Sequence, residues 1–102
     1  MNTDSVDCRR VECPLPVGAP VPAPGDFCWG DEHAPGVRHL YIRIPGSSAS
    51  GFDALECVCG PDPGIERQWG WDGDLERPTL VPSILNPGEW HGHMVAGRMV
   101  SC

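Results

Sequence analysis

The chain has 102 residues, a length typical of a single domain, and a formal net charge of −7 at pH 7. With fourteen acidic residues against seven arginines and no lysine, it would repel a phosphate backbone, so we expect no nucleic-acid partner. No run of residues approaches the roughly 20 apolar positions that span a bilayer, and the N-terminus lacks a cationic segment followed by an apolar one, so we expect neither a membrane partner nor secretion by a signal peptide.

Glycine and proline set the expected fold class. The chain has 13 glycines and 12 prolines, and no apolar pattern of helical period is long enough to indicate a helix. We therefore expect an all-β fold, a small single domain of short antiparallel strands and hairpins. We place this domain at residues 37–102, after an extended Pro-rich arm and loop at residues 1–36.

The N-terminal arm is the first candidate for contact with another protein. Residues 14–25 read Pro-Leu-Pro-Val-Gly-Ala-Pro-Val-Pro-Ala-Pro-Gly, which predicts an extended polyproline II segment. Such a segment loses little entropy when it is immobilised, and residues 26–35 follow as a predicted loop with an aromatic anchor. The candidate partner-binding residues are Pro14, Pro16, Pro20, Pro22, Pro24 and Trp29.

The clearest strand signal lies in the middle of the chain. Residues 37–44 alternate in character, so that Leu40, Ile42 and Ile44 share one face. Residues 46–51 are rich in glycine and serine and predict an exposed hairpin loop. A second strand should follow directly after it.

The second strand brings two sulfurs to one side. Residues 54–59 favour a strand, in which Cys57 and Cys59 face the same way because side chains alternate. Trp69 and Trp71 likewise share one face farther along. We expect these tryptophans to belong to the core, because the chain has few other large side chains to bury.

Two prolines restrict the segment before the C-terminal hairpin. Pro78 and Pro82 bracket the residues Thr79 to Val81, and proline cannot donate a hydrogen bond to a sheet ladder. The pattern predicts an edge strand or an extended loop at this point.

The C-terminal residues predict a tight hairpin centred on Ala96-Gly97, because runs that favour strands flank this pair. The predicted cross-strand pairs are Val95 with Arg98, Met94 with Met99, His93 with Val100, Gly92 with Ser101, and His91 with Cys102. Alternation then places His91, His93 and Cys102 on one face of the hairpin. Gly92 should leave the region beside the histidines uncluttered.

A thiol and imidazole set of this kind is typical of a closed structural zinc site. The candidate zinc ligands are Cys57, Cys59, His91, His93 and Cys102. Two alternatives remain open: the cysteines are small buried hydrophobic residues, or Cys57 or Cys59 forms a disulfide with Cys102. A second, looser zinc group would consist of Cys8, Cys13, Cys28 and His33.

One block of the sequence resembles a known family. It reads Trp-Gly-Trp-Asp-Gly from Trp69 and Pro-Thr-Leu-Val-Pro-Ser from Pro78, and Trp90-His91-Gly92 follows. The block is similar to small bacteriophage and prophage proteins of unknown function, zinc-ribbon-like in pattern and sometimes labelled ammonia monooxygenase. The resemblance implies that the cysteine pair of the family corresponds to Cys57 and Cys59, its histidine to His91 and its last cysteine to Cys102. This chain departs in the spacing of the pair and in having Trp90 where the family has a cysteine.

Together these features predict a non-enzymatic phage protein that acts as a protein-binding or assembly module. We expect an accessory component of the virion head or tail, a decoration or minor capsid protein, found in the virion or in the bacterial host cytoplasm. Other virion subunits are the expected partners. The alternatives are a zinc-dependent enzyme, with Asp72 or Glu89 as its base, and a host-directed regulator expressed during infection.

Overall fold

The computed structural model describes residues 5–12, 22–47, 51–60, 68–86 and 90–101. These residues form nine strands and no helix, which confirms the expected all-β fold. The strands are β1 (Ser5–Asp7), β2 (Arg9–Arg10), β3 (Asp26–Trp29), β4 (Val37–Ile42), β5 (Asp53–Cys59), β6 (Gln68–Trp71), β7 (Leu80–Asn86), β8 (Trp90–Val95) and β9 (Arg98–Ser101). In the part of the chain that the structure describes, nothing helical is long and apolar enough to cross a membrane.

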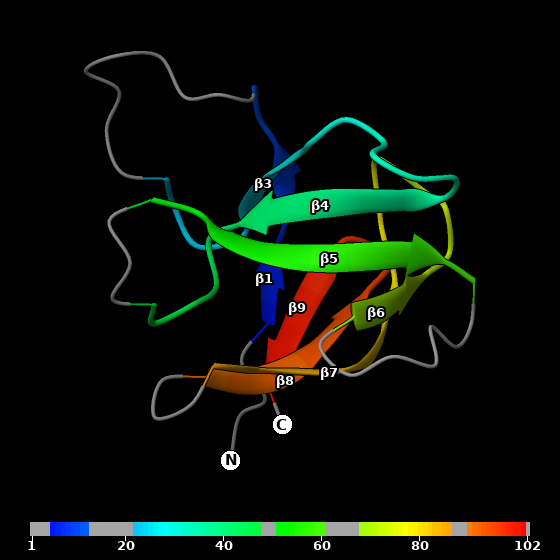
Figure 1. Cartoon of the computed structure of the whole chain (residues 1–102). Helices are drawn as coiled ribbons and strands as arrows, with labels where there is room; N and C mark the ends of the chain where they lie inside the picture. The colour runs from blue at the N-terminus through cyan, green and yellow to red at the C-terminus, as the bar shows by residue number, and fades with distance from the viewer. Residues whose placement is uncertain (1–4, 13–21, 48–50, 61–67, 87–89, 102) are drawn as a thin grey trace.

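All the described strands belong to one sheet that curves back on itself and nearly closes (Figure 1). The strand order is β1-β9-β8-β7-β6-β5-β4-β3-β2. The two end strands, β1 and β2, are separated along the chain only by Cys8. Because β1 pairs with β9 and β2 pairs with β3, one short segment connects the two ends of the sheet. The pairs β2–β3 and β5–β6 are parallel, and the other neighbouring pairs are antiparallel.

The concave side of this sheet is filled by large apolar side chains. The least exposed of them are Phe27, Leu40, Ile42, Leu80, Ile84, Met94 and Met99. They come from β3, β4, β7, β8 and β9, and the same core also contains Leu55 and Cys57 of β5 and Trp71 of β6. Full burial of a side chain of this size contributes about 1.5–3 kcal/mol, which makes this core the main source of stability.

The strand predicted at residues 37–44 is confirmed as β4, with Ile42 as its last residue. Leu40 and Ile42 are fully buried and Ile44 is nearly so, whereas Tyr41 and Arg43 are only partly buried. The predicted alternation is therefore correct. The second predicted strand is β5, and it pairs with β4 as the expected hairpin.

The division of the chain at residue 36 is wrong, because β1, β2 and β3 are all part of the sheet. Residues 26–29 form a strand instead of a loop, and all four of them are buried. Trp29 is only 9% exposed and belongs to the core, so it is not an exposed partner anchor. Of the prolines proposed to bind a partner, Pro22 is buried and Pro24 lies in an exposed turn. Pro14, Pro16 and Pro20 lie outside the described residues.

The segment after Pro78 was predicted to be an edge strand or an extended loop, and this prediction is wrong. It forms β7, which lies between β6 and β8 instead of at an edge. The pairing of β7 with β8 shifts register between Leu80 and Ile84, and Pro82 falls inside this irregularity. A proline is tolerated at such a bulge because no ladder hydrogen bond is required from its nitrogen.

Candidate functional site

The C-terminal hairpin has the predicted register. Met94 pairs with Met99, and His93 pairs with Val100. Both methionines are fully buried, while His91 and His93 are exposed on the convex side. The His91 Nε2 atom lies 3.0 Å from the hydroxyl oxygen of Ser83 on β7.

The predicted zinc ligands do not come together. Cys57 and Cys59 lie on β5 and the histidines on β8, with β6 and β7 between them. Cys57 is completely buried on the concave side, whereas His91 and His93 face outward. The prediction that they share one ion is therefore wrong for these four residues, and Cys102 lies outside the described residues. More generally, no group of three or more His, Cys, Asp or Glu side chains in the described ranges is already arranged to hold a metal ion.

The four cysteines in the described ranges have three different environments. Burial, with a smaller contribution from the Glu56 carboxylate, raises the pKa of the Cys57 thiol to about 12. Burial, together with the nearby charge of Asp7, likewise raises the pKa of Cys8 to about 12. These two thiols therefore behave as small apolar groups, which for Cys57 agrees with the first alternative interpretation. Cys59 is an exposed free thiol.

Cys28 differs from these three because it forms a disulfide bond. Cys57 and Cys59 are both free, so the predicted disulfide from either of them to Cys102 is wrong. A disulfide-bonded Cys28 is also unable to serve in the looser zinc group.

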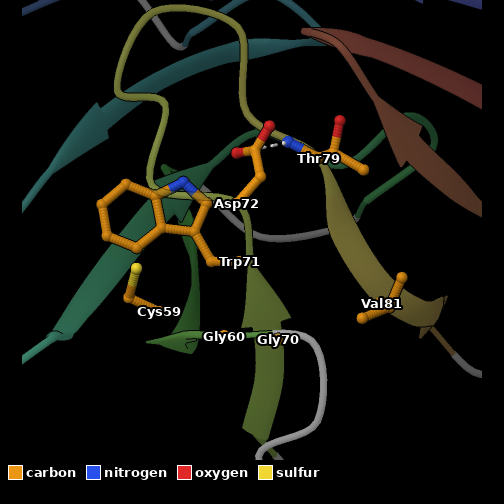
Figure 2. Close-up of a pocket in the computed structure, with 7 residues that line it drawn as sticks. All are labelled: Cys59, Gly60, Gly70, Trp71, Asp72, Thr79 and Val81. Atoms are coloured by element: carbon orange, nitrogen blue, oxygen red, sulfur yellow. Dashed lines mark hydrogen bonds between the residues drawn. The ribbon is translucent and has the colours of Figure 1, made fainter.

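An open pocket of about 440 Å³ lies where β5, β6 and β7 meet. Its lining residues are Cys59, Gly60, Gly70, Trp71, Asp72, Thr79 and Val81. Figure 2 shows the Cys59 thiol beside the Trp71 ring, with Val81 on the other side of the pocket. The walls are mainly apolar, so the pocket suits an apolar group better than a charged one.

Trp71 is held firmly in the wall of this pocket. Its ring packs on Trp29, with ring centroids 4.5 Å apart. Its indole N–H donates a hydrogen bond to the carbonyl oxygen of Asp74, at 3.0 Å. Because the ring face and the indole N–H of Trp71 both have partners, this wall of the pocket is ordered before a ligand binds.

The loop between β6 and β7 is organised by two aspartates. Asp72 Oδ1 accepts hydrogen bonds from the backbone N–H groups of Asp74 and Thr79, at 3.1 and 3.3 Å. Asp74 Oδ1 accepts them from Glu76 and Arg77, and these bonds lower the pKa of Asp74. Asp72, which the enzyme alternative uses as a base, thus orders the loop beside the pocket.

The residues of the sequence block have structural roles as well. Thr79 Oγ1 accepts a hydrogen bond from the backbone N–H of Ala96, at 2.8 Å, which connects the loop to the tip of the terminal hairpin. The indole N–H of Trp69 donates to the carbonyl oxygen of Ser83, at 3.3 Å. These contacts account for the tryptophan and threonine positions of the block through the fold.

An exposed apolar surface adjoins the pocket. Val81 is 43% exposed, Leu85 61% and Val95 50%, and all three lie on β7 or β8. Val81 also lines the pocket, so the pocket and this surface are continuous. We call Val81, Leu85, His91, His93 and Val95 the outer face of β7–β8. Sequence reasoning missed this surface because it did not place β7 beside β8.

Comparisons with known proteins did not identify a relative of this chain. No protein-family model, curated protein or solved structure matches the chain. The resemblance to the phage family therefore stays a prediction.

Proposed function

We propose that this chain is a non-enzymatic protein-binding module whose partner contacts the outer face of β7–β8. The observation that supports it most directly is the position of Val81, which belongs both to this face and to the apolar pocket. A partner lying on the face can insert one apolar side chain into the pocket beside Trp71. Contiguous exposed apolar surface of this kind marks interaction sites on proteins.

The charge distribution supports the same face. The chain has a net charge of −7, yet the segments Leu80–Asn86 and Trp90–Val95 contain no acidic residue, lysine or arginine. A partner that covers these strands does not have to desolvate a carboxylate or an ammonium group. Depletion of charge is also the compositional mark of the buried centre of protein interfaces.

The biological setting that we propose is the assembly of a phage particle. The resemblance of the Trp69 and Pro78 blocks to phage proteins supports this setting. The partner would then be another virion subunit, and the chain an accessory component of the head or tail. A host-directed regulator would use the same face, so the identity of the bound protein separates the two roles.

Charge variants at two exposed strand positions test the face. Leu85 lies on β7, and Ala54 is an exposed residue of β5, outside the proposed interface. In extracts of cells that naturally produce the chain, Leu85→Asp should reduce the captured partner at least tenfold. The reason is that burying an unpaired carboxylate costs several kcal/mol.

Ala54→Asp is the matched control, because it adds the same charge to another exposed strand and should leave capture unchanged. Both variants should give the circular dichroism spectrum of the parent chain. Equal capture by the parent and Leu85→Asp would refute the proposed face, and so would a similar loss in both variants.

A further inference from the structure

Two imidazoles and one carboxylate meet on the other half of the sheet. His39 of β4 is the direct cross-strand partner of Glu56 of β5, and His33 lies in the loop before β4. The Nε2 atoms of both histidines lie 3.7 Å from the same atom, Oε1 of Glu56. The proposed partner-binding face does not include any of these residues.

Neighbouring groups orient this cluster. The two imidazole rings stack with centroids 4.9 Å apart and an angle of 22° between their planes, and Tyr41 stacks on the His39 ring. The side-chain amide of Gln68 donates a hydrogen bond to Oε2 of Glu56. The other carboxylate oxygen, Oε1, is thereby directed toward the histidines.

The loop that holds His33 is also ordered. The backbone N–H of His33 donates to the carbonyl oxygen of Val37 at 3.1 Å, and the N–H of Gly36 donates to the Glu32 carboxylate at 2.8 Å. His33 is thus presented to Glu56 by backbone and side-chain contacts within its own loop. The backbone around His33 is therefore already ordered, and its side-chain rotation is what remains to be fixed when an ion binds.

We propose that His33, His39 and Glu56 bind one divalent transition-metal ion, with zinc as the representative ion and water in the remaining positions. Imidazole nitrogen and carboxylate oxygen bind zinc at about 2.0–2.2 Å, which places neighbouring ligand atoms roughly 3.4 Å apart in a tetrahedral site. The two separations of 3.7 Å exceed this by a few tenths of an ångström.

Closing that difference requires only small side-chain movements. The side chains of His33, His39 and Glu56 are 43%, 39% and 32% exposed, so their rotation is not blocked by close packing. The three donors do not enclose one point in this structure, and no group of the described residues could hold a metal ion without rearrangement, so the proposed site forms only when the ion binds. The hydrogen bond from Gln68 is the kind of outer contact that fixes a ligating carboxylate.

The chain contains a natural control for this site. His91 and His93 are also two exposed histidines on one strand face, but neither β7 nor β8 contains a carboxylate. His91 is in addition engaged with Ser83. If two accessible imidazoles were enough, this pair would bind zinc as well as the proposed cluster does.

Calorimetric titration with Zn²⁺ at pH 7.5 tests the proposal on the full chain without a polyhistidine tag. A Cys59→Ser background removes the exposed thiol, which is a competing zinc ligand. We expect one ion per chain, an increase in Tm on zinc addition, and at least a tenfold loss of affinity in each of His33→Gln, His39→Gln and Glu56→Gln. The double variant His91→Gln/His93→Gln should keep the affinity of the background protein.

Histidine resonances provide a readout that does not depend on how the variants fold. In the Cys59→Ser background, zinc should shift the imidazole proton signals of His33 and His39 and leave those of His91 and His93 in place. The proposal is overturned if this protein binds no zinc, if the His91 and His93 signals shift instead, or if all three cluster variants fold and bind zinc as before.

Discussion

Cys57 and Cys59 lie two residues apart on one strand, yet their thiols should differ sharply in reactivity. Burial raises the pKa of Cys57 to about 12, whereas Cys59 is exposed at the pocket. Only the thiolate reacts with iodoacetamide, so at pH 8 Cys59 should be alkylated at least ~100 times faster than Cys57. Cys8, with a pKa likewise raised to about 12, should remain protected.

Peptide mapping by mass spectrometry after a time course checks this order, and a fully denatured sample provides the control in which the three thiols react alike. Comparable alkylation of Cys57 and Cys59 in the native chain would contradict the burial of Cys57 and the exposure of Cys59.

Gly92 gives a second prediction at the scale of one residue. A Cβ atom at this position would overlap the Trp90 ring and the carbonyl oxygen of Val100. Gly92→Ala should therefore destabilise the fold by about 1–3 kcal/mol, the usual cost of overpacking. Gly51→Ala is the matched control, because a Cβ at Gly51 meets nothing within 4 Å. Denaturant unfolding of the two variants measures the difference, and equal midpoints would contradict the packing of Trp90 over Gly92.

Residue patterns predicted some of these environments. Alternation correctly placed Cys57 with Cys59, and Leu40 with Ile42, on common faces. Alternation could not show that Cys57 is buried while Cys59 is exposed at the pocket. That difference depends on where the strands of the nearly closed sheet end. Gly92 was expected to leave space beside the histidines, whereas it lies on the buried face, under Trp90.

Among the elements, the β8–β9 hairpin is the one whose stability is easiest to adjust. Ala96 occupies the left-handed region with φ 47°, and Gly97 follows with φ 76°. Asparagine adopts this conformation more readily than alanine does, so Ala96→Asn should stabilise the chain by about 0.5–1 kcal/mol. Gly97→Ala should do the opposite, because it adds strain at a positive φ and a Cβ only 3.0 Å from Cα of Arg77. Chemical denaturation checks both signs, and a destabilised Ala96→Asn variant would contradict this turn geometry.

The sequence predicted individual strands and hairpins better than it predicted which strands lie next to one another in the sheet. The register of β8 and β9 follows from the two-residue turn, and the pairing of β4 with β5 follows from a short loop. The position of β7 between β6 and β8 depends on a bulge around Pro82 that local propensity does not reveal. The predicted set of zinc ligands was wrong for the same reason, because it assumed that β5 and the hairpin are close, whereas two strands separate them.

At the scale of the whole molecule, the segment Ser5–Arg10 completes the sheet. The backbone N–H of Cys8 donates to Gly97, at one end of the strand order, and that of Arg9 donates to Gly25, beside the other end. Deleting residues 1–10 should therefore cost several kcal/mol or abolish cooperative unfolding, since it uncovers both β9 and β3.

Arg9→Ala is the control for this deletion. Its side chain is 73% exposed, and the buried Asp26 carboxylate that it contacts keeps a hydrogen bond from the backbone N–H of Ala23, so the substitution should cost less than the deletion and leave unfolding cooperative. A deletion variant that unfolds at the same denaturant concentration as the parent would show that the N-terminal strands are dispensable.

The N-terminal third of the chain was the hardest part to predict. Its proline content indicated a separate arm, yet β1 pairs with β9 and β3 pairs with β4. A partner more than ninety positions away in the sequence, such as Val100 for Ser5, leaves no local signal in so short a strand. The all-β class, in contrast, followed from the glycine and proline content and from the absence of an apolar pattern of helical period.

Site-specific photo-crosslinking from position 85 tests the proposed function most directly. A photoreactive amino acid in place of Leu85, on the outer face of β7–β8, should form a covalent adduct with one partner protein in cells that naturally produce the chain. The same amino acid in place of Ala54 should form none. No adduct from position 85, or the same adduct from both positions, would contradict the assignment of this face as the binding surface.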